Sequence, residues 1–251
     1  MTDIILHGCN GAMGKVIAGL VSEDKEFHIA AGIDIAGGQG QDFPVFTKAQ
    51  DCDVKADVII DFSVAAAVDG ILAYAKDKKL PVVLCTTGLN EEQLALVSET
   101  AQQIPVLRSA NMSLGVNTIF QLAAQAARIL ADRGYDIEIM EKHHNRKLDA
   151  PSGTALAIAD AINEAMDGRY HYIYDRSSEY RKREKDEIGI QSLRGGSIVG
   201  EHEVYFCGTD EVIEIKHTAY SRAIFGKGAL SAAAFLKGKE PGLYRMSDVL
   251  A

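Results

Sequence analysis

The first 34 residues hold the pattern that most restricts the fold of this chain. An apolar run, Ile4 to Leu6, leads into a turn with glycines at positions 8, 11 and 14, and a helical pattern follows. A second apolar run, residues 29–33, ends at Asp34. Such an order is typical of dinucleotide binding, because the glycines let the backbone approach a pyrophosphate and the acid accepts hydrogen bonds from a ribose. The alternative is a plain strand-to-helix turn with a glycine-rich cap.

Strands and helices go on alternating to about residue 111, which predicts an α/β fold with a doubly wound, parallel, Rossmann-like sheet. Continuous apolar runs such as Val58 to Ile60 suit parallel strands that are buried on both faces. The segment 35–56 is glycine-rich and is expected to be a surface loop. Strands are expected at 4–8, 29–34, 57–62, 81–86 and 105–109, and helices at about 12–22, 64–78 and 90–103.

The pattern changes after Asn111 and predicts a second, α+β unit of mainly antiparallel strands. Its elements are helices at about 115–132 and 153–166, a strand at 135–140, and strands between 188 and 221 with a hairpin at 208–210. A final helix is expected at about 223–237. The charged run 175–187 is expected to be a solvated loop. We therefore expect a dinucleotide-binding domain at 1–112, completed by 223–251, and a substrate-binding and oligomerisation domain at 113–222.

Charge and cysteine content limit the possible partners. The net charge of −9 argues against binding to nucleic acid or to a membrane surface. The cysteines are scattered without metal-type spacing, so we expect reduced thiols and no metal site. No apolar stretch reaches the ~18 residues of a membrane span, and the N-terminus leads directly into a strand. The chain is therefore expected to be cytoplasmic, and an anionic substrate needs a local basic cluster.

Such a cluster occurs at residues 142–147, where two histidines, an arginine and two lysines are crowded together. It leads into a helix whose first turn is Ser152-Gly153-Thr154. The free N–H groups of a helix N-terminus form an anion site, and Lys147 and the histidines supply cations and transferable protons. These groups suit a small dicarboxylate substrate. The alternative is a solvated polar loop before a capped helix.

The chain resembles the 4-hydroxy-tetrahydrodipicolinate reductase family, also called dihydrodipicolinate reductases, over essentially its whole length. The segment EKHHNRKLDAPSGTA at 141–155 is similar to the family signature, and GCNGAMG at 8–14 is similar to its glycine turn. Further segments match in the family's order: DFS at 61–63, TTG at 86–88, SANMSLGVN at 109–117, IVGEH at 198–202, SR at 221–222 and GKEPGLYRMSDVL at 238–250.

The resemblance implies NAD(P)H-dependent reduction of 4-hydroxy-tetrahydrodipicolinate to tetrahydrodipicolinate, with loss of water, in lysine (diaminopimelate) biosynthesis. His143 would donate or accept a proton, and Lys147 would donate one near the substrate. His144, Gly153 and Thr154 would bind the substrate carboxylates. A homotetramer built through the antiparallel sheet is also implied. The cofactor would contact Gly8, Cys9, Asn10, Gly11, Ala12, Met13, Asp34, Cys85, Thr86, Thr87, Ser109, Ala110, Asn111 and Met112.

The chain departs from the usual residues of the family at three positions, Ala12, Ile35 and Cys85. Ala12 and Ile35 stand where the family often has basic residues that hold the 2′-phosphate of NADPH. We therefore expect NADH to be preferred, with NADPH as a second cofactor. Cys85 replaces a glycine, a change we expect to be tolerated because only the backbone of this residue faces the cofactor in the family.

Two other classes of function stay open from the residues alone. One is a different NAD(P)-dependent dehydrogenase of similar architecture, which is disfavoured because no cysteine has the context of a nucleophile. The other is a non-catalytic nucleotide-sensing protein, which would need no proton pair such as His143 and Lys147.

Overall fold

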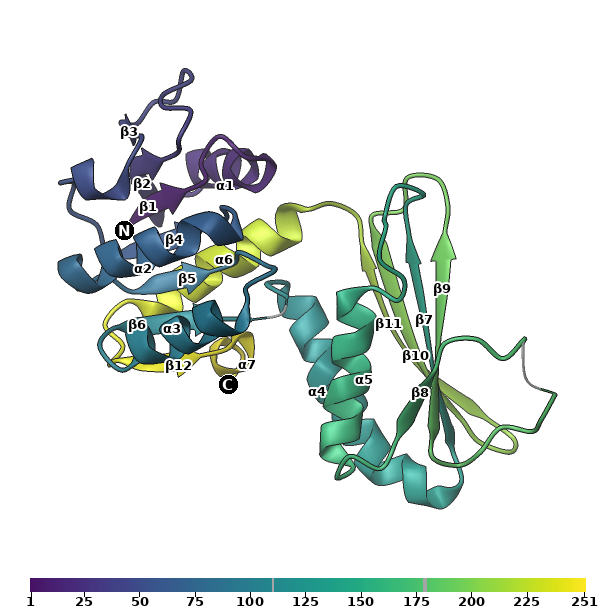
Figure 1. Ribbon diagram of the computed structural model, residues 1–251. Coiled ribbons are helices and arrows are strands. Elements are labelled where there is room, and N and C mark those ends of the chain that lie inside the picture. The colour runs from purple at the N-terminus through teal and green to yellow at the C-terminus, as the bar shows by residue number, and fades with distance from the viewer. Residues whose placement is uncertain (110, 178–179) are drawn as a thin grey trace. The chain divides into compact units, whose positions relative to one another are not determined.

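The computed structural model describes residues 1–109, 111–177 and 180–251 (Figure 1). These residues divide into two compact units, Met1–Leu114 with Arg222–Ala251 and Gly115–Ser221. The C-terminal segment thus belongs with the N-terminal part of the chain, and each unit has its own sheet.

The described residues of the first unit form a seven-stranded sheet in the order β12-β6-β5-β4-β1-β2-β3. Neighbouring strands run parallel throughout this sheet. An order in which β1 lies inside the sheet is that of a doubly wound α/β fold, as the sequence predicted. The strands are β1 (Thr2–His7), β2 (Phe27–Ile33), β3 (Val45–Phe46), β4 (Val58–Asp61), β5 (Val82–Leu84), β6 (Pro105–Arg108) and β12 (Gly242–Tyr244).

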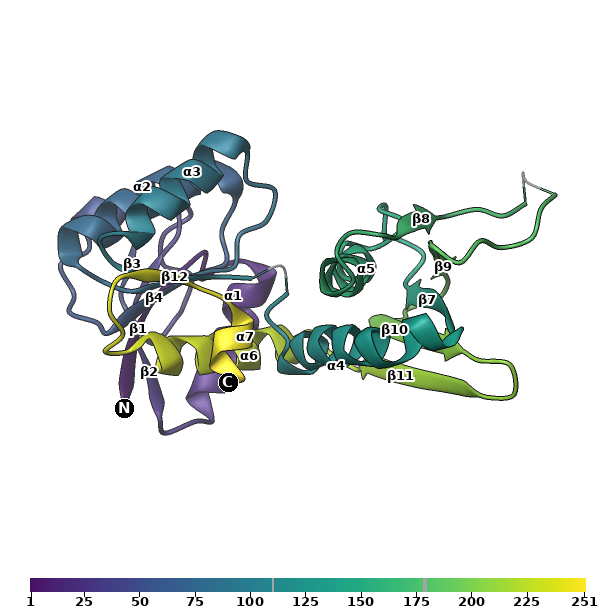
Figure 2. The same ribbon diagram turned by 90° about the horizontal axis from the view of Figure 1, so that it is seen from below.

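Helices cover both faces of this sheet (Figure 2). One face carries α1 (Ala12–Ser22), α6 (Ala223–Leu236) and α7 (Met246–Val249), and the other carries α2 (Ala65–Lys78), α3 (Glu91–Ala101) and the 3-10 turn η1 (Ala49–Asp51). Along β1, Ile4 and Leu6 are buried against the first layer and Ile5 against the second. Burial on both faces explains why the strands are continuous apolar runs.

The C-terminal helix α6 fits into the first unit because glycines line its contacts. A Cβ atom on Gly228 would overlap the carbonyl group of Met112, and one on Gly226 would come within 2.8 Å of Leu20 in α1. Two side chains here would push α6 away from its neighbours. The glycines therefore let residues far apart in the sequence share one core.

The second unit is a sheet with two helices on one face. Its strands are β7 (Asp136–His143), β8 (His171–Ile173), β9 (Glu187–Arg194), β10 (Gly200–Cys207) and β11 (Val212–Ala219). Their order in the described residues is β11-β10-β7-β9-β8. The helices α4 (Leu114–Leu130), continued by the 3-10 turn η2 (Ala131–Arg133), and α5 (Gly153–Ala165) share a core with the sheet.

This second sheet is mixed. β10 pairs antiparallel with β7 and β11, including the hairpin that the sequence predicted. β9 instead pairs parallel with both β7 and β8. The chain crosses from β7 through α5 before it returns to the sheet, which is the connection that parallel pairing requires.

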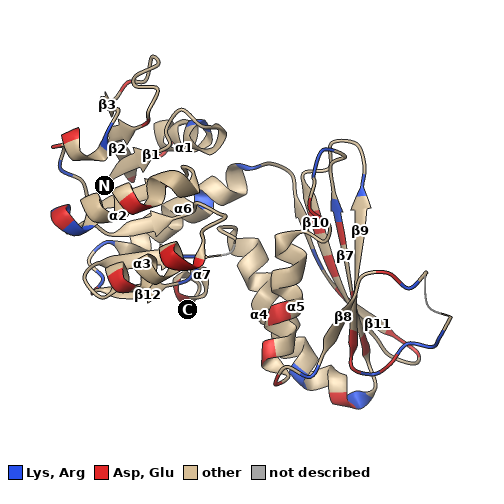
Figure 3. Cartoon of the chain, viewed as in Figure 1, with Lys and Arg blue, Asp and Glu red and all other residues tan. Residues whose placement is uncertain are grey.

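Lysines and arginines are interspersed with acidic residues in the described part of the run 175–187 (Figure 3). This run is not simply a solvated loop, so that expectation was wrong for three of its arginines. Arg176 and Arg181 both form ion pairs with Glu187, whose side chain is fully buried. Arg183 reaches Glu138 at 3.0 Å and Asp136 at 2.8 Å on β7. These pairs hold the loop against the strands.

Among the described residues, no helix is both long and apolar enough to cross a membrane.

Candidate active site

The glycine turn closes tightly around the end of β1. Gly8 has a φ of +79°, and a Cβ atom there would lie 2.5 Å from the carbonyl oxygen of Phe62. A Cβ on Gly14 would overlap the backbone of Gly8 and Cys9. Because Gly11 is the N-cap of α1, no side chain caps the first turn of this helix. The turn thus presents bare backbone at a helix N-terminus, which is a cradle for a phosphate.

Asp34 lies beside this turn and is held as an anion. Its carboxylate accepts hydrogen bonds from the backbone N–H groups of Asn10 at 3.1 Å and Ala36 at 3.0 Å. Partial burial acts to raise the pKa of Asp34, but these hydrogen bonds outweigh it and the pKa is lowered. The charge is therefore present at neutral pH.

Asp34 and the glycine turn line one pocket of about 220 Å³. Its wall is mainly apolar, and among its described lining residues there is no lysine or arginine. The pocket can take an apolar ring next to a group that donates hydrogen bonds to Asp34. The lining residues are His7, Gly8, Gly11, Ile33, Asp34, Ile35, Phe62, Ser63, Val64 and Ala67.

A buried polar network lies at the same edge of the sheet. Asp61, at the end of β4, is fully buried and lies 2.7 Å from Nδ1 of His7. Its second oxygen accepts a hydrogen bond of 2.6 Å from the hydroxyl of Thr86. The backbone N–H of Ser63 donates to both Asp61 and Thr86. Neither His7 nor Asp61 was assigned to the site from the sequence, although each is the last residue of an apolar strand.

The other residues predicted to contact the cofactor follow neighbouring strands. Ala12 and Met13 begin α1, and Thr87 follows β5. Ser109, Asn111 and Met112 follow β6, and Ala110 lies outside the described residues. Since β6, β5, β4, β1 and β2 are neighbours in the sheet, their carboxyl ends form one edge, where ligands bind in such folds.

The two cysteines of this group are poor nucleophiles. Burial raises the pKa of the Cys9 thiol to about 11, and the charge of Asp34 adds to this. Burial likewise raises the pKa of Cys85 well above its usual range. Both thiols therefore stay protonated at neutral pH.

In the second unit, a buried carboxylate organises the basic run. Glu141 on β7 is fully buried, and its oxygen Oε2 lies 2.5 Å from Nδ1 of His143. Arg194 of β9 binds both of its oxygens, at 2.8 and 2.6 Å. The backbone N–H of Ser152 donates to Oε1 at 3.1 Å. Burial acts to raise the pKa of Glu141, but the hydrogen bonds from His143 and Arg194 lower it far below its usual range.

Ser152 is also the N-cap of α5, because its hydroxyl accepts a hydrogen bond from the N–H of Ala155 at 3.2 Å. The next residues, Gly153 and Thr154, form the first turn of the helix. A Cβ atom added to Gly153 would meet no described heavy atom within 4 Å. This helix end is thus open in front of Gly153.

Lys147 lies next to the same helix end. Its ammonium is 2.8 Å from Asp149, and this hydrogen bond lowers the pKa of Asp149. A backbone hydrogen bond from Gly153 adds to the effect. A carboxylate therefore already bridges the lysine and the helix N-terminus. His144 is half-buried, and its Nδ1 atom has no partner among the described residues.

His202 of β10 is a further residue of this cluster that the sequence analysis did not assign. Its Nε2 atom lies 3.0 Å from the hydroxyl of Ser152, and its ring lies edge-on to His143 at 5.2 Å. Burial lowers the pKa of His202 to about 3, and the neighbouring His143 adds to this. His202 is therefore neutral at physiological pH. Its only sequence signal was its place in the IVGEH segment.

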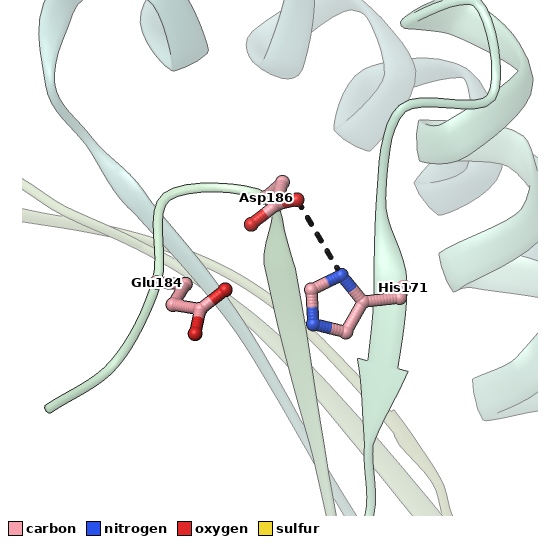
Figure 4. A group of neighbouring side chains, drawn as sticks. All are labelled: His171, Glu184 and Asp186. Atoms are coloured by element: carbon pink, nitrogen blue, oxygen red, sulfur yellow. Dashed lines mark ion pairs between the residues drawn. The ribbon is translucent and has the colours of Figure 1, made fainter. Parts of the chain in front are cut away.

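A group of potential metal ligands lies elsewhere on the second unit (Figure 4). Atoms of His171, Glu184 and Asp186 lie within 4.8 Å of one another, and all three side chains are exposed. His171 pairs with Asp186 at 3.7 Å, and Glu184 pairs with Arg181 at 3.4 Å. Ion pairs thus account for the arrangement, and we assign no ligand to it.

The fold and the site together define a class. A Rossmann-like sheet with a glycine turn at a helix N-terminus and an acid beside it, joined in one chain to a unit with histidines and a lysine near a helix end, is typical of pyridine-nucleotide-dependent oxidoreductases. The chain matches the family models described as "Dihydrodipicolinate reductase, N-terminus" over residues 2–112 and "Dihydrodipicolinate reductase, C-terminus" over 115–250. It belongs to the dihydrodipicolinate reductase family and is an NAD(P)H-dependent oxidoreductase.

Individual proteins agree with this assignment. The chain is 51% identical to the 4-hydroxy-tetrahydrodipicolinate reductase of Caldanaerobacter subterraneus over 100% of its own length and 98% of that protein. It is 48% identical to the enzyme of the same name from Clostridium tetani, over 100% and 97%. The resemblance stated from the sequence motifs is therefore confirmed.

Solved structures support the fold. The dipicolinate-bound dihydrodipicolinate reductase from Paenisporosarcina sp. TG-14 has a TM-score of 0.82 at 23% identity, covering 98% of this chain and 97% of that one. A probable dehydrogenase from Thermotoga maritima has a TM-score of 0.62 at 10% identity, covering 98% and 92%. The expected fold, a Rossmann-like sheet with a second α+β unit, is confirmed.

Proposed function

We propose that this chain reduces 4-hydroxy-tetrahydrodipicolinate to tetrahydrodipicolinate with NAD(P)H, with loss of water, in the diaminopimelate route to lysine. Membership of the family over both halves of the chain supports this reaction. The observation that carries it is the cluster of His143, Lys147 and the N-terminus of α5, gathered around the buried Glu141.

The first unit, corresponding to residues 1–112 and 223–251, is proposed to bind the cofactor. The residues present fit a dinucleotide. Gly8 and Gly14 leave a cradle that a Cβ would fill, and Asp34 is an anion directly after β2, where such folds carry the acid that binds the ribose. When bound, the cofactor supplies the hydride. Backbone contacts are assigned to residues 8–13, ribose contacts to Asp34, and contacts near the nicotinamide to Cys85, Thr86, Thr87 and the segment 109–112.

NADH is proposed as the preferred cofactor and NADPH as the weaker one. The pocket beside Asp34 has no lysine or arginine among its described lining residues, and Ala12 and Ile35 are exposed without a charge. A 2′-phosphate would thus meet an anion and no compensating cation from these positions.

The second unit, residues 113–222, is proposed to bind the substrate dicarboxylate. Gly153 and Thr154 offer backbone N–H groups for one carboxylate, and His144 contacts the other. His143 donates or accepts a proton, and Lys147 donates one near the substrate. The bridge from Lys147 through Asp149 to Gly153 supports this assignment, because it shows that a carboxylate fits these partners.

A homotetramer built through the second sheet is also proposed. Side chains alternate between the two faces of a strand, so Leu193 and Val212 lie on the face opposite the helical core. Both are about half exposed, at 46% and 58%. Burial of this face against another copy would remove them from water.

Each of the cysteines, all within the described ranges, is a free thiol, which suits the proposed cytoplasmic location.

The decisive experiment supplies the purified enzyme with the freshly formed condensation product of pyruvate and aspartate semialdehyde and follows NADH oxidation. Turnover that depends on both precursors supports the proposal. Turnover with an amino acid or aldehyde instead would indicate another dehydrogenase, and NADH binding without any turnover would indicate a nucleotide sensor.

A further inference from the structure

Glu141 has no role of its own in the reaction proposed above. This carboxylate is fully buried yet binds three different parts of the second unit: His143 on its own strand, Arg194 of β9 and the backbone of Ser152. A buried carboxylate is costly unless it is paired and hydrogen-bonded. Arg194 alone supplies a bidentate partner, so the contacts to His143 and Ser152 are additional.

The contact to His143 selects one atom of that ring for chemistry. A carboxylate that is ionised at neutral pH only accepts hydrogen bonds, so Nδ1 of His143 must carry the proton that it donates to Glu141. No described residue bonds the other nitrogen, Nε2, which packs near Gly200 of β10. The His143 side chain keeps 11% of its surface exposed. Nε2 is therefore the atom that can exchange a proton with a ligand or with water.

The contact to Ser152 ties the same carboxylate to the helix end. Ser152 begins the segment whose next residues, Gly153 and Thr154, are the proposed anion site. Its hydroxyl is held in turn by the neutral His202. Because Oε1 and Oε2 of one side chain hold Ser152 and His143, the helix end and the imidazole cannot move independently of Glu141.

We propose that Glu141 is the positioning residue of the substrate site: it fixes His143 as the Nδ1–H tautomer with Nε2 available, and it fixes the N-terminus of α5. This inference rests on the proposed function for the role of His143. Arg194 neutralises the carboxylate and so moderates its attraction for a proton on His143.

The groups that face His143 come from every strand packed around it. They are Glu141 on β7, Arg194 on β9 and His202 on β10, with His217 of β11 opposite His202 in the strand register. The charge of Lys147, in the loop after β7, helps to lower the pKa of His202. Of these groups, only Glu141 is an anion in contact with the imidazole, so its removal and the removal of Arg194 should have opposite effects.

The test compares Glu141→Gln with Arg194→Gln. Glu141→Gln should lower kcat by about 10- to 100-fold. This is the loss usually seen in metal sites when the hydrogen-bond partner that orients a histidine is removed. The limb of the kcat–pH profile that responds to this contact should move to lower pH, because Glu141→Gln lacks the negative charge beside the imidazole. Arg194→Gln should move the same limb to higher pH. NADH affinity should not change in either variant.

Nitrogen-15 NMR of labelled histidine gives a readout that does not depend on turnover. The wild-type His143 signal should show the Nδ1–H tautomer, Glu141→Gln should show a mixture of tautomers, and Glu141→Asp should restore part of the wild-type signal. Glu187→Gln is the matched control, because Glu187 is also fully buried and paired with two arginines but lies at the far end of β9. It should lose stability without moving the pH limb or the tautomer signal.

The outcomes separate this inference from the proposed function. A wild-type tautomer signal retained in Glu141→Gln, or pH limbs that move in the same direction in Glu141→Gln and Arg194→Gln, would overturn the positioning role. If Glu141→Gln does not fold, the tautomer signal of Glu141→Asp and the direction in which the pH limb moves in Arg194→Gln decide. Full turnover in His143→Gln would instead refute the proton-transfer role proposed for His143. A wild-type enzyme without turnover on the condensation product would refute the proposed function, while its tautomer signal would still test the contact.

Discussion

Replacing Asp34 by asparagine should improve the use of NADPH. The carboxylate is held by the N–H groups of Asn10 and Ala36 at the pocket beside the glycine turn, and it is ionised. A 2′-phosphate on the adenosine ribose brings about two negative charges at neutral pH. In the wild type these charges face Asp34, whereas an asparagine would keep a hydrogen-bond acceptor without the charge.

The magnitude follows from the exposure of the pocket. Two unit charges 4 Å apart interact by about 1 kcal/mol in bulk water and about 4 kcal/mol at the effective dielectric near a protein surface. Asp34 is half-buried in an open pocket, so the lower part of this range applies. A repulsion of about 1.4 kcal/mol corresponds to a tenfold preference. We therefore expect kcat/KM for NADPH to rise about tenfold in Asp34→Asn, with a smaller loss for NADH.

The assay measures kcat/KM for both cofactors at several salt concentrations, because salt should narrow the gap in the wild type more than in the variant. Asp57→Asn serves as control, since this aspartate pairs with Lys237 and not with the pocket. A wild-type preference for NADPH, or a cofactor ratio unchanged in Asp34→Asn, would refute the reasoning. The compensating cation would then be sought first at Lys15 of α1 or at Lys48, which precedes η1, and these would be the next residues to mutate.

Three further predictions concern the second unit. Lys147→Ala should lower turnover by about 10²- to 10⁴-fold at unchanged NADH affinity, and near-normal turnover in the folded variant would exclude the proposed role. Gly153→Leu should fold, because a Cβ at this position meets open space. It should no longer bind a pyridine dicarboxylate inhibitor but should still bind NADH, as separate titrations would measure. Equal loss of both ligands would indicate misfolding. Burial acts to raise the pKa of Glu203, but its lysine partners lower it from 4.5 to about 2, so its contribution to stability is present above pH 4.5 and is lost as pH falls toward 2. The Tm difference between the wild type and Glu203→Gln should therefore shrink over that range, and a constant difference would contradict it.

The first unit could be predicted well because its signals are local. Strands such as β1 and β4 are apolar on both faces, and the glycine turn lies within seven residues of sequence. The short strands β8 and β12 were missed, since three residues are too few to show a period. The parallel pairing of β9 was also missed, because periodicity shows which face is buried but not the direction of the neighbouring strand.

The site divides along the same line. His143, Lys147 and Gly153 could be named from the sequence because they lie within eleven residues of one another. Arg194 and His202 could not, since they reach Glu141 only through strand register. Arg194 lies opposite His143 in the pairing of β7 with β9, and His202 lies opposite Glu141 in the pairing of β7 with β10. Residues that act through register carry no spacing signal in a single sequence.

Register also explains why Arg194 matters for the chemistry of His143. A histidine that is the sole counter-ion of a buried carboxylate cannot lose its proton without leaving a buried charge unpaired, which is strongly unfavourable. His143 is not in that position, because Arg194 holds both oxygens of Glu141 and carries the compensating charge. The imidazole can therefore be oriented by the carboxylate and still change its protonation state. The proton exchange proposed for His143 needs this separation of orientation from charge balance, and the three strands β7, β9 and β10 supply it together.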